Sequence, residues 1–547
     1  MSARLGTTLD APDAPPRTTV RLSPGWAMAI ATAVALGVRL FTLSRPGFLT
    51  QPNEYDDGVY LGAAIRLTQG VLPYHDFAFV QPPGILLLMS PVALVARVTS
   101  TAVGLGLARL LTVLASTACV PLAGNLVRRR GTVAVALTCG ILAVYPPDVA
   151  SAHTLLLEPW MNLLCLLGAN AAFSRGRLAA SPARLAWAGA ALGFASVVKF
   201  WAMAPAAVLL VCVLVAAEPA VRVRRAVMYI AALAAAFVVP LLPFVLSGPG
   251  TFFSSTVRYQ AARTGTSAPE SLRLAHVTGL IDFLNYYGHV SWAGVNSLFA
   301  QSVVADTAPA RPDGLPYVVA LAFVLVLAAG LFIGRRDIAL GEWFAVATAV
   351  IALGAILIYS AFFYHYPAFP GVWLAIVAGV ALSAIVARLG TLPRRAAVGL
   401  VAAVLGAAMV VQLVEVSEVR LPEGLSEISA AIPPGACVFT DQISLVISAN
   451  RFEAAKPGCP VVLDSLANTL VLTHGVSVQG GAIHNAKAAA AWRAIVSKAQ
   501  FVWLSPNVWR RLPWRDGYPP AWFTKEYKQI APPAGYIRGI GNLFERR

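Results

Sequence analysis

The stretch Asn53-Glu-Tyr-Asp-Asp-Gly-Val-Tyr60 decides how the rest of this chain is interpreted. It places three carboxylates, those of Glu54, Asp56 and Asp57, within four residues, shortly after the first long apolar segment. The surrounding chain is strongly apolar, because 58% of its 547 residues are hydrophobic and only 12% are charged. Acidic residues are costly to hold at a membrane boundary, so a functional role is expected for this group.

The apolar composition indicates a protein that crosses a membrane many times. Mean hydropathy is +0.70, and apolar runs of nearly twenty residues recur along the chain. A run of that length spans the hydrocarbon core of a bilayer, which is about 30 Å thick. The formal charge of +16 collects in short loops between these runs, as the positive-inside rule describes, so it gives no reason to expect nucleic acid as a partner.

Arginine-rich loops predict the topology. If they are all cytoplasmic, the spans between them must come in pairs. Residues 1–25, rich in Pro, Thr and Arg, are expected to be a disordered cytoplasmic tail and not a cleaved signal peptide. The basic loops lie at 128–130, 174–184, 222–225, 334–336 and 388–395. The expected spans, about eleven, are 26–43, 105–127, 132–146, 155–173, 189–199, 202–217, 227–246, 317–333, 344–359, 372–387 and 397–414.

The same pairing keeps residues 44–104 together on the outer face. Residues 85–98 form an apolar stretch of only about fourteen residues, which suits a helix lying on the membrane better than a span. If this stretch did span, the arginines at 128–130 would lie outside. We therefore expect a transmembrane domain at 26–415 with large outer loops at 44–104 and 247–314.

The segment at 416–547 has the composition of a water-soluble domain. Strands that alternate with helices indicate a small α/β domain, and the topology predicts that it is extracytoplasmic. Short buried strands are expected at 436–441, 460–465 and 501–505, and a helix with an Asn cap at 485–499. The sequence thus predicts a polytopic α-helical membrane protein, of about eleven transmembrane helices, with a C-terminal soluble α/β domain.

Two of the six cysteines lie in this C-terminal segment. Cys437 and Cys459 are candidates for a disulfide, because an extracytoplasmic compartment is oxidising; two unpaired thiols are the alternative. The other four lie in expected spans and are interpreted as buried apolar fillers.

The first outer loop resembles that of the GT-C superfamily of membrane glycosyltransferases. An acidic pair after the first span is followed by Tyr60, by Tyr74-His-Asp-Phe77, and by Pro82-Pro83 at the head of an interfacial helix. The pattern is similar to that of aminoarabinose transferases, protein O-mannosyltransferases and actinobacterial arabinofuranosyltransferases. The resemblance implies transfer of a sugar from a polyprenyl-phosphate-linked donor to a glycan, lipid or protein acceptor, on the outer face of the cell membrane.

The resemblance also implies a catalytic role for the acidic pair. Asp56 would be the general base that deprotonates the acceptor hydroxyl, with Asp57 as the second choice. Two adjacent acids raise the pKa of one of them, which suits a base that works near neutral pH. Alternatively, both aspartates only stabilise the start of a helix expected at 58–69.

Other polar residues are expected to bind donor or acceptor around this base. Lys199, at the outer end of a span, would contact the donor phosphate, or else snorkel to the interface. Glu158 would be a second site acid or a structural partner of another helix. The expected substrate-binding set is Tyr60, His75, Asp76, His153, Glu158, Lys199, Arg258, Tyr259, Arg263 and His365.

Structural roles are the alternatives for several members of this set. His75 and Asp76 could orient the loop by a hydrogen bond. Arg258, Tyr259 and Arg263 lie in an expected interfacial helix that could close over the phosphate or only rest on lipid headgroups. His365 lies in an aromatic stretch that could be part of an interfacial aromatic belt.

No cofactor is firmly implied besides the polyprenyl-phosphate sugar, which is a substrate. A divalent metal ion could bind Asp56, Asp57 and His75, but their spacing is not diagnostic of a metal site, and none is expected. The alternative function is a transporter or flippase of a lipid-linked saccharide. Transporters commonly place polar sites near the midplane of the membrane and show repeated halves, whereas the polar segments expected here lie on one side.

Overall fold

The computed structural model describes residues 23–262, 269–279 and 314–547, except for 360, 419–420, 422, 453–455, 479, 507, 515–518 and 532–539. Most of the expected N-terminal tail and the predicted site residue Arg263 therefore lie outside the described residues.

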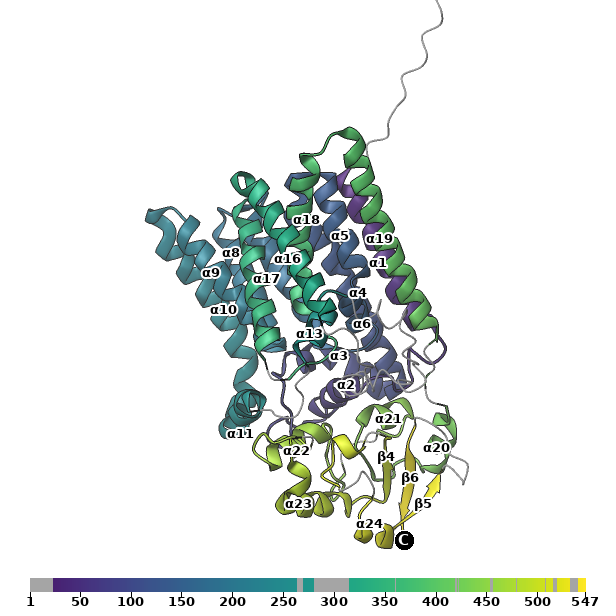
Figure 1. Cartoon of the computed structure of the whole chain (residues 1–547). Coiled ribbons are helices and arrows are strands. Elements are labelled where there is room, and N and C mark those ends of the chain that lie inside the picture. Colours follow the sequence, from purple (N-terminus) through teal and green to yellow (C-terminus); the bar gives the residue numbers. More distant parts are fainter. Residues whose placement is uncertain are drawn as a thin grey trace, which may run out of the picture.

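Long helices stand side by side in a bundle, and a small domain covers one end of it (Figure 1). The bundle contains α1 (Pro24–Ser44), α4 (Thr101–Val127), α5 (Thr132–Val144), α6 (Pro146–Ala152), α7 (Leu157–Ala172), α8 (Pro182–Val198), α9 (Met203–Ala216), α10 (Pro219–Ser247), α16 (Leu315–Gly334), α17 (Leu340–Ile358), α18 (Ala368–Ala387) and α19 (Thr391–Glu418). Short connections are the 3-10 turns η1 (Arg128–Arg130), η2 (Phe200–Ala202) and η6 (Arg335–Asp337) and the hairpin of β1 (Phe173–Ser174) and β2 (Arg177–Leu178).

The helices confirm that this is a multi-pass membrane protein. Fewer of them are long enough to be candidate spans than the eleven that were expected. Among the described residues, seven helices are long and apolar enough to cross a membrane, or eight if α5 and α6 form one broken span. These two helices meet at 54°, because Pro146 has no N–H to continue the ladder and holds Tyr145 in an extended conformation. All eleven expected segments are helical, but α7, α8 and α9 have only 16, 17 and 14 residues, so their crossing of the bilayer remains a prediction.

Two glycines of α8 allow its backbone to approach that of α10 closely. A Cβ on Gly189 or Gly193 of α8 would lie 2.4 and 2.3 Å from the carbonyl oxygens of Tyr229 and Leu233 on α10. Small residues permit such close backbone approach between membrane helices, where dispersion contacts drive association. The packing of α8 on α10 in turn holds the C-terminal end of α8, where Lys199 lies.

Three of the basic loops meet at the end of the bundle opposite the small domain (Figure 1). Arg129 and Arg130 both bond the buried Glu342 carboxylate, with N–O distances of 2.7 and 2.8 Å. The N–H of Gly341 donates to the carbonyl of Gly176 in the neighbouring loop at 3.0 Å. We call this end of the bundle the loop end, and the end that carries the small domain the domain end.

Short helices lie between the bundle and the small domain, at the domain end (Figure 1). Two come from the first large loop, and α3 occupies nearly the stretch expected to lie on the membrane. The short helices are α2 (Asp56–Leu67), α3 (Gly84–Val98), α11 (Pro249–Phe253), the π-helix η3 (Ser254–Arg258), α12 (Tyr259–Ala261) and α13 (Glu270–Val277).

The C-terminal domain is a small mixed α/β unit. Its sheet has the order β3-β4-β6-β5, with β3 parallel to β4 and the other pairs antiparallel. The strands are β3 (Val438–Thr440), β4 (Phe501–Leu504), β5 (Tyr527–Ala531) and β6 (Asn542–Arg546). The helices are α20 (Leu425–Ala431), α21 (Ile443–Ser448), α22 (Ser465–Leu472), η7 (Ala482–His484), α23 (Ala486–Val496), η8 (Val508–Arg510) and α24 (Ala521–Glu526).

The expected elements of this domain are partly confirmed. Strands β3 and β4 fall inside the expected stretches, and α23 begins after Asn485, whose side chain accepts from Ala488 N at 3.0 Å. The strand expected at 460–465 is wrong. There the Asp464 carboxylate caps the start of α22 by accepting from Ala467 N at 2.8 Å, so the chain turns into a helix.

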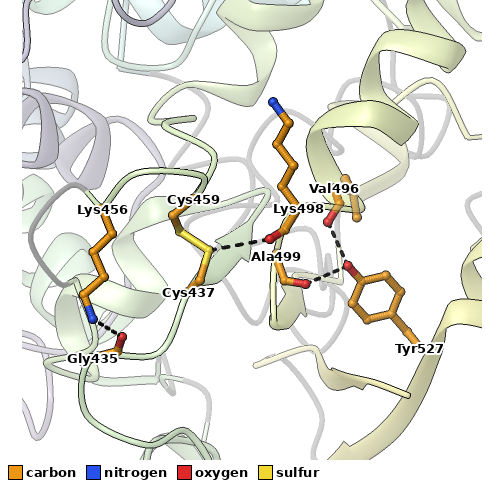
Figure 2. The surroundings of a disulfide bond; sticks show 8 residues. All are labelled: Gly435, Cys437, Lys456, Cys459, Val496, Lys498, Ala499 and Tyr527. Atoms are coloured by element: carbon orange, nitrogen blue, oxygen red, sulfur yellow. Dashed lines mark hydrogen bonds between the residues drawn. A yellow bond between two sulfur atoms is a disulfide. The ribbon is translucent and has the colours of Figure 1, made fainter.

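Cys437 and Cys459 form the expected disulfide (Figure 2). It ties the residue before β3 to the loop that leads into α22, across 22 residues of sequence. The backbone of Cys437 also bonds to the next strand, since its carbonyl accepts from Phe501 N at 3.0 Å. The disulfide therefore links the loop before α22 to the edge strand β3, where it pairs with β4.

Removing this disulfide should destabilise the C-terminal domain. Closing a loop of this length typically contributes about 2–4 kcal/mol, mainly by restricting the unfolded chain. We expect the double variant Cys437→Ser/Cys459→Ser to unfold at a lower temperature than the oxidised wild type in near-UV circular dichroism, and the same lower temperature is expected for the wild type after reduction. Reductant should not lower the unfolding temperature of the double variant further. Equal unfolding temperatures for the oxidised wild type and the double variant would contradict this role.

Candidate functional site

A buried ion pair anchors the acidic loop to the bundle. Asp57, in the first turn of α2, accepts from Arg109 of α4 at 2.5 Å and from the Thr154 hydroxyl at 2.8 Å. Arg109 also donates to Asn53 Oδ1 at 2.6 Å and to the carbonyls of Phe48 and Gln51 at 2.8 and 2.9 Å. One guanidinium thus fixes the chain from Phe48 to Asp57, because its donors form a rigid fork.

Asp56 faces different surroundings, since successive helix residues point about 100° apart. Its carboxylate is half-buried and accepts from the hydroxyl of Tyr60, one turn later, at 3.3 Å. It also interacts electrostatically with Lys199 and with Glu54. The structure therefore separates the two predicted catalytic acids: Asp57 is held in an ion pair, and Asp56 faces the other charged groups of the domain end.

Two helix ends and one loop bring the other charged residues together. Glu158, in the first turn of α7, is fully buried, and its Oε1 accepts from Lys199 Nζ. Its Oε2 lies 2.9 Å from His365 Nδ1, which comes from the loop between α17 and α18. The structure thus brings three of the predicted substrate-binding residues into direct contact.

The break between α8 and α9 places Lys199. This residue ends α8 in an extended conformation, and the 3-10 turn η2 follows it. Its ammonium group lies 3.8 Å from the ring centroid of Trp201 and 4.2 Å from that of Tyr366. Aromatic faces stabilise a desolvated cation, so Lys199 is held in the protein and not extended to the membrane surface.

Glu54 joins the acidic loop to the loop after α17. Its Oε2 accepts from the Tyr364 hydroxyl at 2.7 Å, and its Oε1 accepts from Tyr55 N at 2.8 Å. Burial, with the nearby Asp56 charge, raises the pKa of Glu54 to about 7. The sequence predicted a raised pKa within the adjacent aspartate pair, and the structure shows a raised pKa for the neighbouring acid Glu54, which was not among the predicted site residues.

These residues form one site, which we call the junction cluster: Glu54, Asp56, Tyr60, Glu158, Lys199, Tyr364, His365 and Tyr366. Burial is the main reason why the pKa of Tyr60 is raised, and the carboxylates of Asp56 and Glu158 add to it. Burial and Glu54 likewise raise the pKa of Tyr364. Both phenols therefore stay protonated and can donate hydrogen bonds within the cluster.

Other predicted residues lie outside the junction cluster. His75 and Asp76 pair with each other in an exposed turn, at 2.7 Å. The backbone N–H of Leu72 lowers the pKa of Asp76 and holds the turn. His153 is buried, and its Nε2 has no hydrogen-bond partner among the described residues.

The predicted interfacial segment contacts the C-terminal domain. Arg258 is exposed, whereas the hydroxyl of Tyr259 lies 3.3 Å from His474 Nδ1. Gln260, which follows, donates to the carbonyl of Val80 at 3.0 Å and ties the segment to the first large loop.

Sequence reasoning missed several residues that build the site. Arg109 lies inside an apolar span, and an ionisable residue there is a signal that could have identified it. The same signal applies to Arg39, whose guanidinium bonds Asp148 inside the bundle. Tyr364 and Tyr366 are adjacent to His365, but nothing in their spacing shows which group each contacts.

No cluster of three or more His, Cys, Asp and Glu side chains that could hold a metal ion is found in the described part of the chain.

Comparisons with known proteins identify the fold. Models of protein families and curated proteins gave no match to the sequence. Among solved structures, ArnT from Cupriavidus metallidurans in the apo state is 16% identical, with a TM-score of 0.55 over 95% of this chain and 97% of ArnT. The same protein bound to undecaprenyl phosphate gives a TM-score of 0.54 at 15% identity, over 91% of this chain and 99% of ArnT.

A second similar structure is archaeal. The oligosaccharyltransferase AglB from Archaeoglobus fulgidus, in complex with an inhibitory peptide and a dolichol-phosphate, is 11% identical with a TM-score of 0.52. The match covers 88% of this chain and 69% of AglB. The chain therefore has the fold of the GT-C membrane glycosyltransferases, and the resemblance inferred from the first outer loop is confirmed at the level of the fold.

Glu54 should make stability depend on pH. Its pKa is about 7 in the folded protein, against an ordinary 4.5, so the folded state holds the proton more tightly than the unfolded chain does. The resulting stabilisation is fully present below pH 4.5 and is lost as the pH rises through 7. We expect the unfolding temperature in detergent to fall less steeply between about pH 5 and 8 in Glu54→Gln than in the wild type.

The matched control is Glu423→Gln, which changes an exposed glutamate of the C-terminal segment. It should keep the wild-type dependence on pH. Identical pH profiles for Glu54→Gln and the wild type would show that the Glu54 carboxyl does not titrate in this range.

Proposed function

We propose that this protein transfers a sugar from a polyprenyl-phosphate-linked donor to a hydroxyl group of an acceptor at the junction cluster. The supporting observation is that a half-buried carboxylate, Asp56, and a buried cation, Lys199, interact within one cluster at the end of the membrane helices. Two structures of the same fold hold lipid phosphates, undecaprenyl phosphate in ArnT and a dolichol-phosphate in AglB. Lipid phosphates are therefore the natural donor class for this chain.

Lys199 would bind the donor phosphate while the polyprenyl tail lies in the bilayer. The lysine is now neutralised by Glu158, so a phosphate must compete for it. His365 contacts the other carboxylate oxygen of Glu158, so Glu158 keeps one partner when Lys199 bonds to the phosphate. Arg258, exposed on the neighbouring segment, supplies a second cation near the same end of the bundle. Charge-assisted bonds of this kind are strong and directional.

Asp56 is the better base of the two aspartates. Asp57 is fully buried and already accepts from Arg109 and Thr154, and protonating it would break the ion pair that anchors the loop. Asp56 is half-buried, so an acceptor hydroxyl can reach it. A general base must lie within hydrogen-bond reach of the proton that it removes, and only the more accessible carboxylate meets that condition.

The reaction is a direct displacement. As the Asp56 carboxylate removes the hydroxyl proton, the acceptor oxygen forms a bond to the anomeric carbon. The bond from that carbon to the phosphate oxygen breaks, and its electron pair leaves with the polyprenyl phosphate. The proton ends on Asp56, and the extra negative charge on the released phosphate faces Lys199. A single displacement inverts the anomeric centre.

The domain end would face the outside of the cell membrane. The basic loops described at the loop end would be cytoplasmic under the positive-inside rule, with the N-terminus on the same side. The C-terminal domain would then be extracytoplasmic, where its disulfide is stable. From this position it can contribute to binding a glycan, lipid or protein acceptor.

Asp56→Asn should abolish most of the transfer activity. Loss of a general base typically costs about 10²- to 10⁴-fold in rate, and the amide that replaces it cannot take the proton. The measurement is transfer of label from a synthetic polyprenyl-phosphate sugar by the purified full-length protein. Binding of polyprenyl phosphate should remain, because Lys199 is unchanged. The control is Asp337→Asn, an exposed acid at the loop end, which should transfer at the wild-type rate.

Two outcomes would contradict the proposal. Undiminished transfer by Asp56→Asn would exclude this residue as the base. A wild-type protein that moves labelled lipid across vesicles without transferring sugar would indicate a flippase instead.

A further inference from the structure

The side chain of Tyr55, the residue directly before Asp56, contacts the C-terminal domain. It is buried, and its hydroxyl donates to Asp464 Oδ1 at 2.9 Å. The same hydroxyl oxygen accepts from Leu466 N at 3.2 Å. The Arg511 guanidinium covers the ring, 4.3 Å from its centroid. The tyrosine is thus held at its polar tip and on its face by residues more than 400 positions away in sequence.

The partners of Tyr55 are themselves fixed. Asp464 caps α22, because its Oδ1 also accepts from Ala467 N. Arg511 donates to Asp441 Oδ2 at 2.7 Å and to Ser505 Oγ at 2.8 Å, and these two residues directly follow β3 and β4. Tyr55 is therefore tied to the sheet of the domain through one buried arginine and to α22 through one carboxylate.

A second contact holds the same turn of α2. A Cβ added to Gly58 would lie 2.3 Å from the backbone nitrogen of Ser444, so α21 packs directly on the backbone of α2. Asp56 and Asp57 lie between Tyr55 and Gly58. The first turn of α2 is thus held from the bundle by Arg109 and from the domain by α21 and α22.

Helix α22 also reaches the segment that carries Arg258. The chain leaves α22 through His474 and Gly475, which have positive φ values of 55° and 105°. His474 Nδ1 lies 3.3 Å from the Tyr259 hydroxyl. The start of α22, a helix of eight residues, therefore contacts the acidic loop. The chain just after the end of α22 contacts the segment at 249–262.

We infer that the C-terminal domain positions the Asp56 carboxylate, with Tyr55 and Asp464 as positioning residues that act through α22. This inference rests on the proposed function, and it gives the domain a part in the rate of transfer besides any part in acceptor binding. If the hydroxyl bond to Asp464 is lost, the first turn of α2 can move, and the base no longer meets the acceptor hydroxyl in a reactive geometry. Lys199 is held by other contacts, so donor binding is unaffected.

The test compares Tyr55→Phe with the wild type in the full-length protein. The substitution keeps the ring under Arg511 and removes only the hydroxyl. We expect kcat to fall about 10- to 100-fold, because small displacements of a catalytic group have effects of this size. KM for the polyprenyl-phosphate sugar should stay within about twofold, since the phosphate site is unchanged.

Three further variants separate positioning from a loss of folding. Asp464→Asn keeps an oxygen for both the cap and Tyr55 and should retain nearly the wild-type kcat, whereas Asp464→Ala should behave like Tyr55→Phe. Tyr527→Phe is the matched control, because this buried tyrosine of the same domain also loses hydroxyl bonds, at 2.8 Å to Val496 and Ala499 carbonyls. It should lower stability without lowering kcat.

The inference can fail independently of the proposed function. Amide hydrogen exchange at residues 56–60 should increase about tenfold or more in Tyr55→Phe and not in Tyr527→Phe, whether or not sugar transfer is detected. A wild-type kcat and unchanged exchange in Tyr55→Phe would overturn the inference while leaving transfer intact. A complete absence of transfer by the wild-type protein would overturn the proposed function alone.

Discussion

The ion pair between Asp57 and Arg109 is the constraint on which the geometry of the domain end depends. Both side chains are fully buried, and an isolated buried charge would destabilise the fold by several kcal/mol. The pair is tolerated because Arg109 distributes further hydrogen bonds to Asn53 and to two backbone carbonyls. It fixes the rotation of α2 about its axis, and Asp56 consequently faces the junction cluster.

The fully buried carboxylate of the junction cluster, Glu158, has two partners. Glu158 faces both Lys199 and His365, so one partner can leave for a phosphate while the other remains. Glu54 and Tyr364 close the cluster from the side of the first large loop. The C-terminal domain holds the residue before Asp56, Tyr55, so residues more than 400 positions apart in sequence contribute to the geometry of the domain end.

The sequence predicted the helices well because long apolar runs and basic loops are local signals. It also predicted Glu158, Lys199 and His365 as substrate-binding residues, and the structure brings these three side chains into contact. It did not identify the partner of Asp57, because Arg109 is 52 residues away and only the folded structure shows the pairing. Tyr55 contacts residues of the C-terminal domain that are more than 400 positions away, so no local sequence pattern could predict these contacts.

The wrongly predicted strand in the C-terminal domain and the smaller number of long helices have physical causes. The apolar run at 461–463 indicates a strand, but Asp464 immediately caps a helix and removes the chain from the sheet. Strands β5 and β6 are antiparallel partners at the end of the chain, and their alternation is too irregular to be recognised. Helices α8 and α9 are separated by the turn at Lys199, so each is shorter than a span of ordinary length.

The most direct test of the account is an experimental structure of the full-length protein with polyprenyl phosphate bound. We predict that the phosphate lies within about 3.5 Å of Lys199 Nζ, on the side of the cluster that carries Asp56, and that the lysine no longer bonds Glu158. A phosphate bound away from the domain end, with the pair of Lys199 and Glu158 intact, would contradict the account.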